Sequence, residues 1–233
     1  MNSKVSIIYM MAASFSFATG TILSKILGFV ESAQALHPLQ IAHSRFFFAL
    51  LFISFICFIR KKSIISSNLK VHCLRSFCGW AGVTILFTAV IHIPVSDATA
   101  ITFLNPICAM VLAVFILNEK VGMYRWIAVL VAFLGAIFLI RPTSEFDFSP
   151  VAALCLFGAI IMGFEIICIK ILSGRESFLQ ILFINNLIAT IIGTVPVIFI
   201  FKFPNLVEIG FLVGVGFSFL LGQFFFLNAI RGS

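Results

Sequence analysis

The sequence predicts an all-α integral membrane protein of about eight transmembrane helices. Apolar residues make up 62% of the 233 residues and charged residues only 10%, whereas a soluble domain carries roughly 25% charged residues. The apolar residues fall in runs of about 20, the length that a helix needs to cross a bilayer. Lysine and arginine gather in the short segments between these runs, as they do in membrane proteins.

Eight apolar runs are long enough to span a membrane. They lie at about 5–27, 40–59, 76–93, 97–117, 123–140, 148–170, 178–201 and 207–229. Only residues 60–75 leave room for a sizeable polar loop. The first run is longer than the apolar core of a signal peptide, so we expect it to remain as a span.

The fourth span, residues 97–120, carries the clearest local signals. Ser96 and Asp97 precede it and are predicted to cap its N-terminus. Asn105-Pro106 lies inside the run, where proline removes one backbone hydrogen bond and predicts a kink. Because non-ideal backbone at membrane depth lines cavities, we place Asn105 and Pro106 at a substrate site.

The basic residues predict the orientation of the chain. With the N-terminus in the cytoplasm, the inner segments hold Lys4, Arg60, Lys61, Lys62, Lys70, Arg75, Lys120, Arg125, Lys170, Arg175 and Arg231. The outer ends hold only Lys25, Arg141 and Lys202. This asymmetry predicts that both termini are cytoplasmic. It also explains the net charge of +7 without a nucleic-acid partner, so the expected partners are the lipid bilayer and a small molecule.

An internal repeat divides the chain at about residues 1–142 and 147–233. The matches occur in the same order and at nearly constant spacing: Lys25–Leu27 with Lys170–Leu172, Leu39–Ile41 with Leu179–Ile181, Arg45 with Asn185, and Ala89 with Ala229. A unit of five spans is odd, so the second unit would enter the membrane inverted. Inverted repeats are typical of secondary carriers, whose substrate site lies between the repeats near mid-membrane.

The first 142 residues resemble an EamA-type unit of the drug/metabolite transporter superfamily. The likeness rests on Ser44-Arg45-Phe46, Phe87-Thr88-Ala89-Val90, Ile93-Pro94, Phe103-Leu104-Asn105-Pro106 through Glu119, Arg125-Trp126 and Gly135. Within this family the sequence is most similar to S-adenosylmethionine uptake carriers of obligate intracellular bacteria. The resemblance implies a multi-pass protein of the bacterial inner membrane, with two five-helix units.

The second unit departs from that pattern. By the repeat alignment, the counterparts of the fourth and fifth spans are absent. Either the chain is a fragment or remnant, or it is an eight-span carrier that completes itself with another copy as a homodimer. Gly210 and Gly214 form a GxxxG pattern that would suit close helix packing within the chain or in such a dimer.

Glu165 and Arg45 are the main candidates for substrate binding or coupling. A carboxylate deep in a span costs roughly 2.5–3.5 kcal/mol unless it faces water or a partner. Glu165 is therefore predicted to couple protons or to bind a cationic substrate, the alternative being a structural ion pair with Lys170 or Arg45. Arg45 would bind a carboxylate or phosphate, or bond carbonyls freed at Pro106, and is close enough to the outer surface to snorkel.

Five other residues receive weaker predictions. Trp80 is a candidate to stack on a flat, nucleoside-like ligand, the alternative being packing or an interfacial position. Lys25, Lys170 and Arg75 are expected to snorkel as topology anchors. Glu119 is expected to close the hairpin after the fourth span by pairing with Arg125.

These observations predict a secondary transporter of a small metabolite, with no cofactor. No GxxxxGK[ST] motif occurs, so a gradient or exchange would drive transport. The alternative is an inactive remnant or partner subunit of such a carrier. An enzyme is not expected, because His37, His43, His72 and His92 lie on different elements and no cysteine cluster has metal-ligand spacing.

Overall fold

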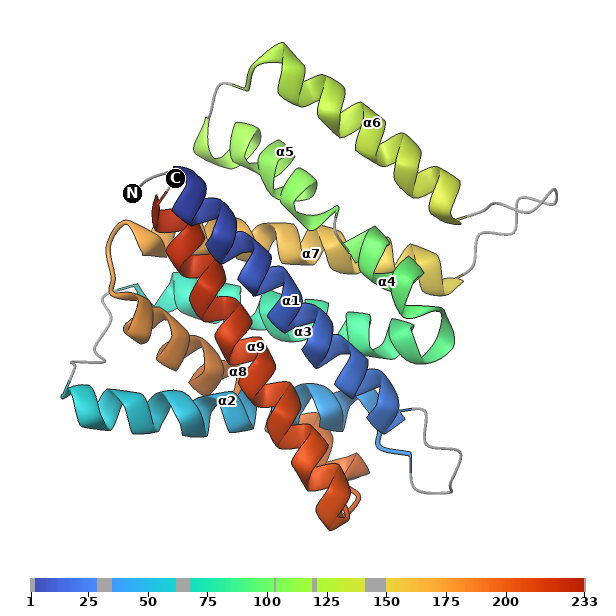
Figure 1. The fold of residues 1–233 in the computed structure, drawn as a ribbon, viewed down its shortest axis with the longest axis vertical. Coiled ribbons are helices and arrows are strands. Elements are labelled where there is room, and N and C mark those ends of the chain that lie inside the picture. The colour runs from blue at the N-terminus through green and yellow to red at the C-terminus, as the bar shows by residue number, and fades with distance from the viewer. Residues whose placement is uncertain are drawn as a thin grey trace.

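A computed structural model describes residues 3–28, 35–61, 68–102, 104–118, 121–140 and 150–232. Within these ranges the protein is all-helical (Figure 1). The helices are α1 (Ser3–Gly28), α2 (Pro38–Arg60), α3 (Leu69–His92), α4 (Val95–Thr102), α5 (Asn105–Leu117), α6 (Met123–Ile140), α7 (Pro150–Ser173), α8 (Phe178–Ile200) and α9 (Leu206–Gly232). The predicted fold class is confirmed.

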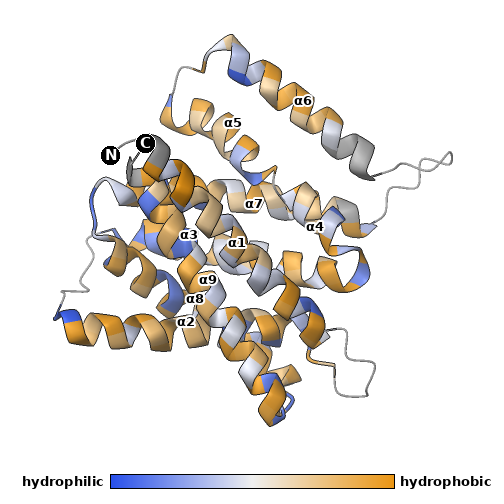
Figure 2. Ribbon diagram, in the orientation of Figure 1, coloured by the Kyte–Doolittle hydropathy of each residue, from blue (hydrophilic) through white to orange (hydrophobic). Residues whose placement is uncertain are grey.

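Seven stretches of the described chain are long and apolar enough to cross a membrane, counting α4 and α5 together as one. The remaining predicted span, at residues 123–140, corresponds to α6, whose described apolar stretch is shorter (Met123–Gly135) and which lies at the edge of the bundle (Figure 1). Hydrophobic residues make up most of every helix (Figure 2), and many of the large ones are exposed. Phe15 is 76% exposed and Phe199 is 83% exposed. An apolar surface of this extent suits contact with lipid and not with water.

The predicted kink in the fourth span is confirmed as a break between two helices. α4 ends at Thr102 and α5 begins at Asn105, directly before Pro106. The amide of Cys108 donates to the carbonyl of Leu104 at 2.9 Å and thereby starts the second helix. The break follows from Pro106, which has no N–H to continue the first helix.

The predicted cap of this span is wrong. α4 begins at Val95, and the carbonyl of Pro94 accepts from the amides of Asp97 and Ala98, both at 3.1 Å. Ser96 instead bonds the carboxylate of Asp97. The helix starts earlier than predicted because the Pro94 carbonyl accepts its first backbone hydrogen bonds.

α3 begins at Leu69, seven residues before the predicted start at residue 76. The sequence assigned this stretch to a polar loop because it contains His72 and Arg75. Both side chains are fully buried in the structure. They obtain polar partners from the α7–α8 region, which allows a helix with a polar start to enter the core.

The helices pack mainly as three crossing pairs: α1 with α9, α3 with α7, and α2 with α8. α5 packs on the side of α7. If α7, α8 and α9 repeat α1, α2 and α3, exchanging the two units turns the α1–α9 pair into the α7–α3 pair and leaves the α2–α8 pair unchanged. In Figure 1, α1 and α7 run in opposite directions, as inversion requires. The repeat stays a prediction that this packing supports.

Two apolar clusters occupy opposite halves of the bundle. One includes Ile41 near the start of α2, and the other includes Ile53 further along the same helix. α7 contributes Cys155 to the first cluster and Leu172 to the second. Arg45 of α2 and Glu165 of α7 lie along these helices between the residues of the two clusters.

Candidate functional site

A cavity of about 410 Å³ lies at the centre of the bundle. Residues of α1, α2, α3, α4, α5, α7 and α9 line it. The charged residues of the described chain that line it are Arg45, Arg75 and Glu165. They come from three different helices, so only the tertiary packing brings them together. A cavity of this volume is within the usual range for a small-molecule site.

Glu165 projects from the middle of α7 toward α3. Its Oε1 lies 3.8 Å from Nη2 of Arg75, and its side chain is 12% exposed. Gly79 of α3 makes room for it, since a Cβ at that position would lie 3.0 Å from the Glu165 carboxyl carbon. Glu165 thus pairs with Arg75, whereas the sequence suggested Lys170 or Arg45 as its partner.

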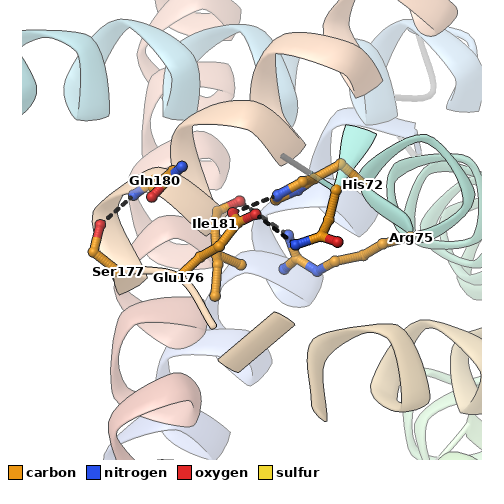
Figure 3. A network of polar contacts seen from close by, with 7 residues as sticks. His72, Arg75, Glu176, Ser177, Gln180 and Ile181 are labelled. Carbon is orange, nitrogen blue, oxygen red and sulfur yellow. Dashed lines mark hydrogen bonds and ion pairs between the residues drawn. The ribbon is translucent and has the colours of Figure 1, made fainter. Parts of the chain in front are cut away.

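The expectation that Arg75 snorkels to the membrane surface is wrong. Its side chain is fully buried, and its Nη1 donates to the carbonyl of Ile181 at 3.1 Å (Figure 3). Arg75 also lines the cavity. The sequence predicted a snorkelling anchor because Arg75 stands at the start of the third apolar run, whereas burial against α7 and α8 supplies the partners that a charged group needs.

Arg45 also points inward. It is 4% exposed, and its guanidinium lies over the rings of Phe46 and Phe219, at 4.4 Å and 4.3 Å from their centroids. These distances are typical of cation–π contacts. The interior position excludes snorkelling and leaves Arg45 facing the same cavity as Glu165.

The break in the fourth span reaches the cavity. Thr102, Asn105 and Pro106 line it, and the side-chain amide nitrogen of Asn105 lies 4.0 Å from the sulfur of Met162. Backbone that departs from helical geometry at this depth therefore faces a cavity, as membrane proteins require.

Trp80 lies outside the set of residues that line the cavity. It packs near Gly193, where an added Cβ would lie 3.0 Å from the indole nitrogen and 3.2 Å from a carbon of His43. His43 in turn bonds Thr194 at 3.0 Å. This position matches the alternative for Trp80, packing between helices, and does not support stacking on a ligand in the cavity.

Lys25 and Lys170, two of the remaining topology residues, are also outside the set that lines the cavity. Lys25 is half-buried near the end of α1, and Lys170 is exposed near the end of α7. Their role as anchors stays a prediction. Glu119 lies outside the described residues.

A second polar cluster joins α3 to the α7–α8 turn (Figure 3). Nε2 of His72 and Oε2 of Glu176 lie 2.7 Å apart, and Asn68 donates to the other carboxylate oxygen at 3.4 Å. Sequence reasoning missed Glu176. The available signal was the spacing of His72 and Arg75, which puts both on one helix face and predicts polar partners opposite them.

The opposite end of the bundle has a matching contact between α2 and the α8–α9 turn. The side chain of Gln40 donates to the carbonyl of Lys202 at 2.7 Å and accepts from its amide at 3.1 Å. Gln40 is near the start of α2, which has 23 residues and a length of about 34 Å. The His72–Glu176 and Gln40–Lys202 contacts thus lie at opposite ends of the bundle.

The sequence profile of the EamA-like transporter family matches residues 4–141. The chain belongs to this family. Among relatives, an S-adenosylmethionine uptake transporter of Rickettsia bellii is 28% identical, over 97% of this chain and 76% of the relative. The pseudopaline exporter CntI of Pseudomonas aeruginosa is 27% identical, over 97% of this chain and 78% of the relative.

A solved crystal structure supports the fold independently. It aligns with 95% of this chain and 80% of its own chain, with a TM-score of 0.63 and 16% sequence identity. The family match and the apolar helices together make this EamA-like transporter a multi-pass membrane protein.

Proposed function

We propose that this EamA-like transporter is a secondary carrier that moves a small metabolite across a bacterial inner membrane, with S-adenosylmethionine as the first candidate. The observation that carries the proposal is the central cavity with Arg45, Arg75 and Glu165. It lies between two apolar clusters, and both predicted repeats contribute to it. Secondary carriers hold their substrates at such a position.

The two end contacts suit alternating access. A carrier must open one end of its cavity while the other stays closed. The His72–Glu176 contact joins α3 to the α7–α8 turn, and the Gln40–Lys202 contact joins α2 to the α8–α9 turn. With both termini in the cytoplasm, the first contact would break in the inward-open state and the second in the outward-open state.

The candidate substrate fits the chemistry of the cavity. S-adenosylmethionine carries a sulfonium cation, an α-amino-acid group and an adenosine. Glu165 offers a negative charge for a cation, while Phe17 and Phe219 offer aromatic surface. The names of the Rickettsia relatives point to the same substrate.

Uptake by purified protein in liposomes tests the proposal. We expect labelled S-adenosylmethionine to accumulate, driven by a proton gradient or by exchange with unlabelled substrate inside. Glu165→Gln should abolish uptake while the protein still inserts, because the amide keeps the shape of the side chain and loses its charge.

The assay also separates the proposal from its alternative. An inactive remnant or a partner subunit would insert without accumulating S-adenosylmethionine or amino acids under any gradient. Uptake by Glu165→Gln at the unaltered rate would remove Glu165 from the mechanism.

A further inference from the structure

The cavity contains more positive than negative charge. Two guanidinium groups and one carboxylate line it among the described residues. Arginine stays protonated at physiological pH, so Arg45 and Arg75 both carry a charge that burial makes costly to leave unmatched. Glu165 can balance only one of them.

The guanidinium groups also keep unused hydrogen-bond donors. Nη1 of Arg45, and Nε and Nη2 of Arg75, are buried without a hydrogen-bond partner among the described residues. Arg75 uses Nη1 for the Ile181 carbonyl, and its 3.8 Å separation from Glu165 is too long for a hydrogen bond. Arg45 is 4% exposed and Arg75 is 0% exposed, so water does not reach these donors. A ligand carboxylate reaches them only when the two side chains turn further into the cavity that they line.

We propose that Arg45 and Arg75 together bind a carboxylate of the ligand while Glu165 faces its cationic group, so that the substrate carries an α-amino-acid head group. The inference rests on the proposed transport function and narrows its substrate class. Guanidinium donors match carboxylate oxygens in geometry and charge. In an α-amino acid the carboxylate and the ammonium are attached to one carbon, which suits receptor groups of opposite sign as close as Arg75 and Glu165.

The rest of the cavity accommodates a larger group attached to this head. Phe17, Phe219 and Phe226 provide aromatic surface, and Thr99 and Gln223 provide hydrogen-bonding groups. A purely cationic ligand would compete with Arg75 for Glu165 and would offer no acceptor to the guanidinium donors. A ligand that has both charges places a carboxylate at the two arginines and an ammonium at Glu165.

Binding to the purified protein in nanodiscs tests the head group without requiring transport. The first probe pair is S-adenosylmethionine and its decarboxylated analogue, which differ only in the carboxylate. The second probe set is L-methionine and L-phenylalanine, each compared with its amide. We expect each acid to bind roughly 10- to 100-fold more tightly than its partner, the effect of lost hydrogen bonds to charged groups.

Variants locate the effect within the protein. Arg45→Gln should reduce the preference for acid over amide to less than about threefold, because its donors are lost. Arg60→Gln, an exposed change at the end of α2, is the matched control and should leave the preference unchanged. Arg75 also donates to the carbonyl of Ile181, so its removal would disturb the fold. Arg75→Lys is therefore the variant to use at this position, because lysine keeps the positive charge but lacks the forked donors of the guanidinium group.

The outcomes separate this inference from the proposed function. If an amino acid is preferred over its amide but S-adenosylmethionine is neither bound nor transported, the head group stands and the candidate substrate fails. If acids and amides bind equally, or no acid binds at millimolar concentration, the inference is overturned even where uptake occurs. Competition by inorganic phosphate but not by amino acids would also overturn it.

Discussion

The α3–α7 and α1–α9 crossings share a packing pattern but carry different chemistry. In the predicted repeat, α7 corresponds to α1 and α9 to α3. Gly82 of α3 faces Met162 of α7, and Gly222 of α9 faces Phe17 of α1. These pairs are related by the same offsets, 140 and 145 residues, as Gln40 with Gln180 and Lys25 with Lys170. A common backbone arrangement is thus retained at both crossings.

The chemistry changes at the level of the cavity. At one crossing Gly79 makes room for Glu165, and at the other Gly20 makes room for Phe219. The same offsets relate Gly20 to Glu165 and Gly79 to Phe219. The glycine therefore lies on α3 at one crossing and on α1 at the other. The large residue opposite it is the acid Glu165 in the first case and Phe219, whose ring contacts Arg45, in the second. If the predicted repeat holds, a symmetric scaffold supports an asymmetric site.

The two crossings also differ in what covers them. Ala159 and Gly163 of α7 are buried, and Gly163 packs directly on the backbone of α5. Their repeat counterparts on α1, Ser14 and Ala18, are exposed. Ser14 and Ala18 line the cavity, on a helix face that no other helix of the described chain covers.

The largest expected effect comes from filling the covered face. In Gly163→Leu, the new Cβ would lie 3.0 Å from the amide nitrogen of Ala109, which is backbone and cannot yield easily. We expect the free energy of unfolding to fall by about 3 kcal/mol, as for severe overpacking. Ala18→Leu is the matched control and should change it by no more than about 0.5 kcal/mol. Equal losses in detergent-titration unfolding would show that the two faces do not differ.

The second effect concerns the Gly20–Phe219 contact. A Cβ at residue 20 would lie 2.6 Å from the Phe219 ring, which is buried and packs against the rings of Phe17 and Phe87. Gly20→Ala should therefore cost about 1–3 kcal/mol in the free energy of unfolding. Gly20→Ala combined with Phe219→Leu should regain part of this loss, and no recovery in the double variant would count against direct overlap as the cause.

The third effect concerns Gly79, where the neighbour is the end of a flexible side chain. In Gly79→Ala the Glu165 carboxylate must move by a few tenths of an ångström or more. We expect uptake to fall roughly tenfold because the carboxylate is displaced, while the free energy of unfolding changes by less than about 1 kcal/mol. A loss of stability as large as that of Gly20→Ala would mean that the two crossings respond alike.

The polar start of α3 gives a further test of asymmetry. His72 and Arg75 correspond to Leu212 and Val215 of α9, which are buried in an apolar cluster. Glu176→Ala removes the partner of a fully buried imidazole and should cost about 1–3 kcal/mol in unfolding. Adding His72→Leu, the α9 residue, should recover part of that loss; a double variant less stable than Glu176→Ala would contradict this.

The smallest effect is expected at Trp80. Its side chain packs near Gly193 and outside the cavity. Trp80→Phe keeps most of this apolar contact, so the affinity for S-adenosylmethionine in the binding assay should stay unchanged. Phe219→Leu is the comparison, because it removes a ring that does line the cavity and should weaken binding.

The sequence by itself determined the apolar spans, the helix break at Pro106 and the presence of a carboxylate, Glu165, inside a span. Apolar runs of this length can only be buried or face lipid, Pro106 cannot continue a helix, and a carboxylate such as Glu165 is too costly in a span to lack a role. These signals are local, so they can be read without knowing what packs against them.

The tertiary structure alone decided which polar groups meet. Arg75 stands beside residues that resemble a loop, and only the packing of α3 on α7 shows that it pairs with Glu165. Glu176 carried no signal of its own, and Trp80 packs at Gly193 instead of facing the cavity. A buried charge depends on partners distant in the chain, so its position follows from the packing of the helices and not from the residues next to it.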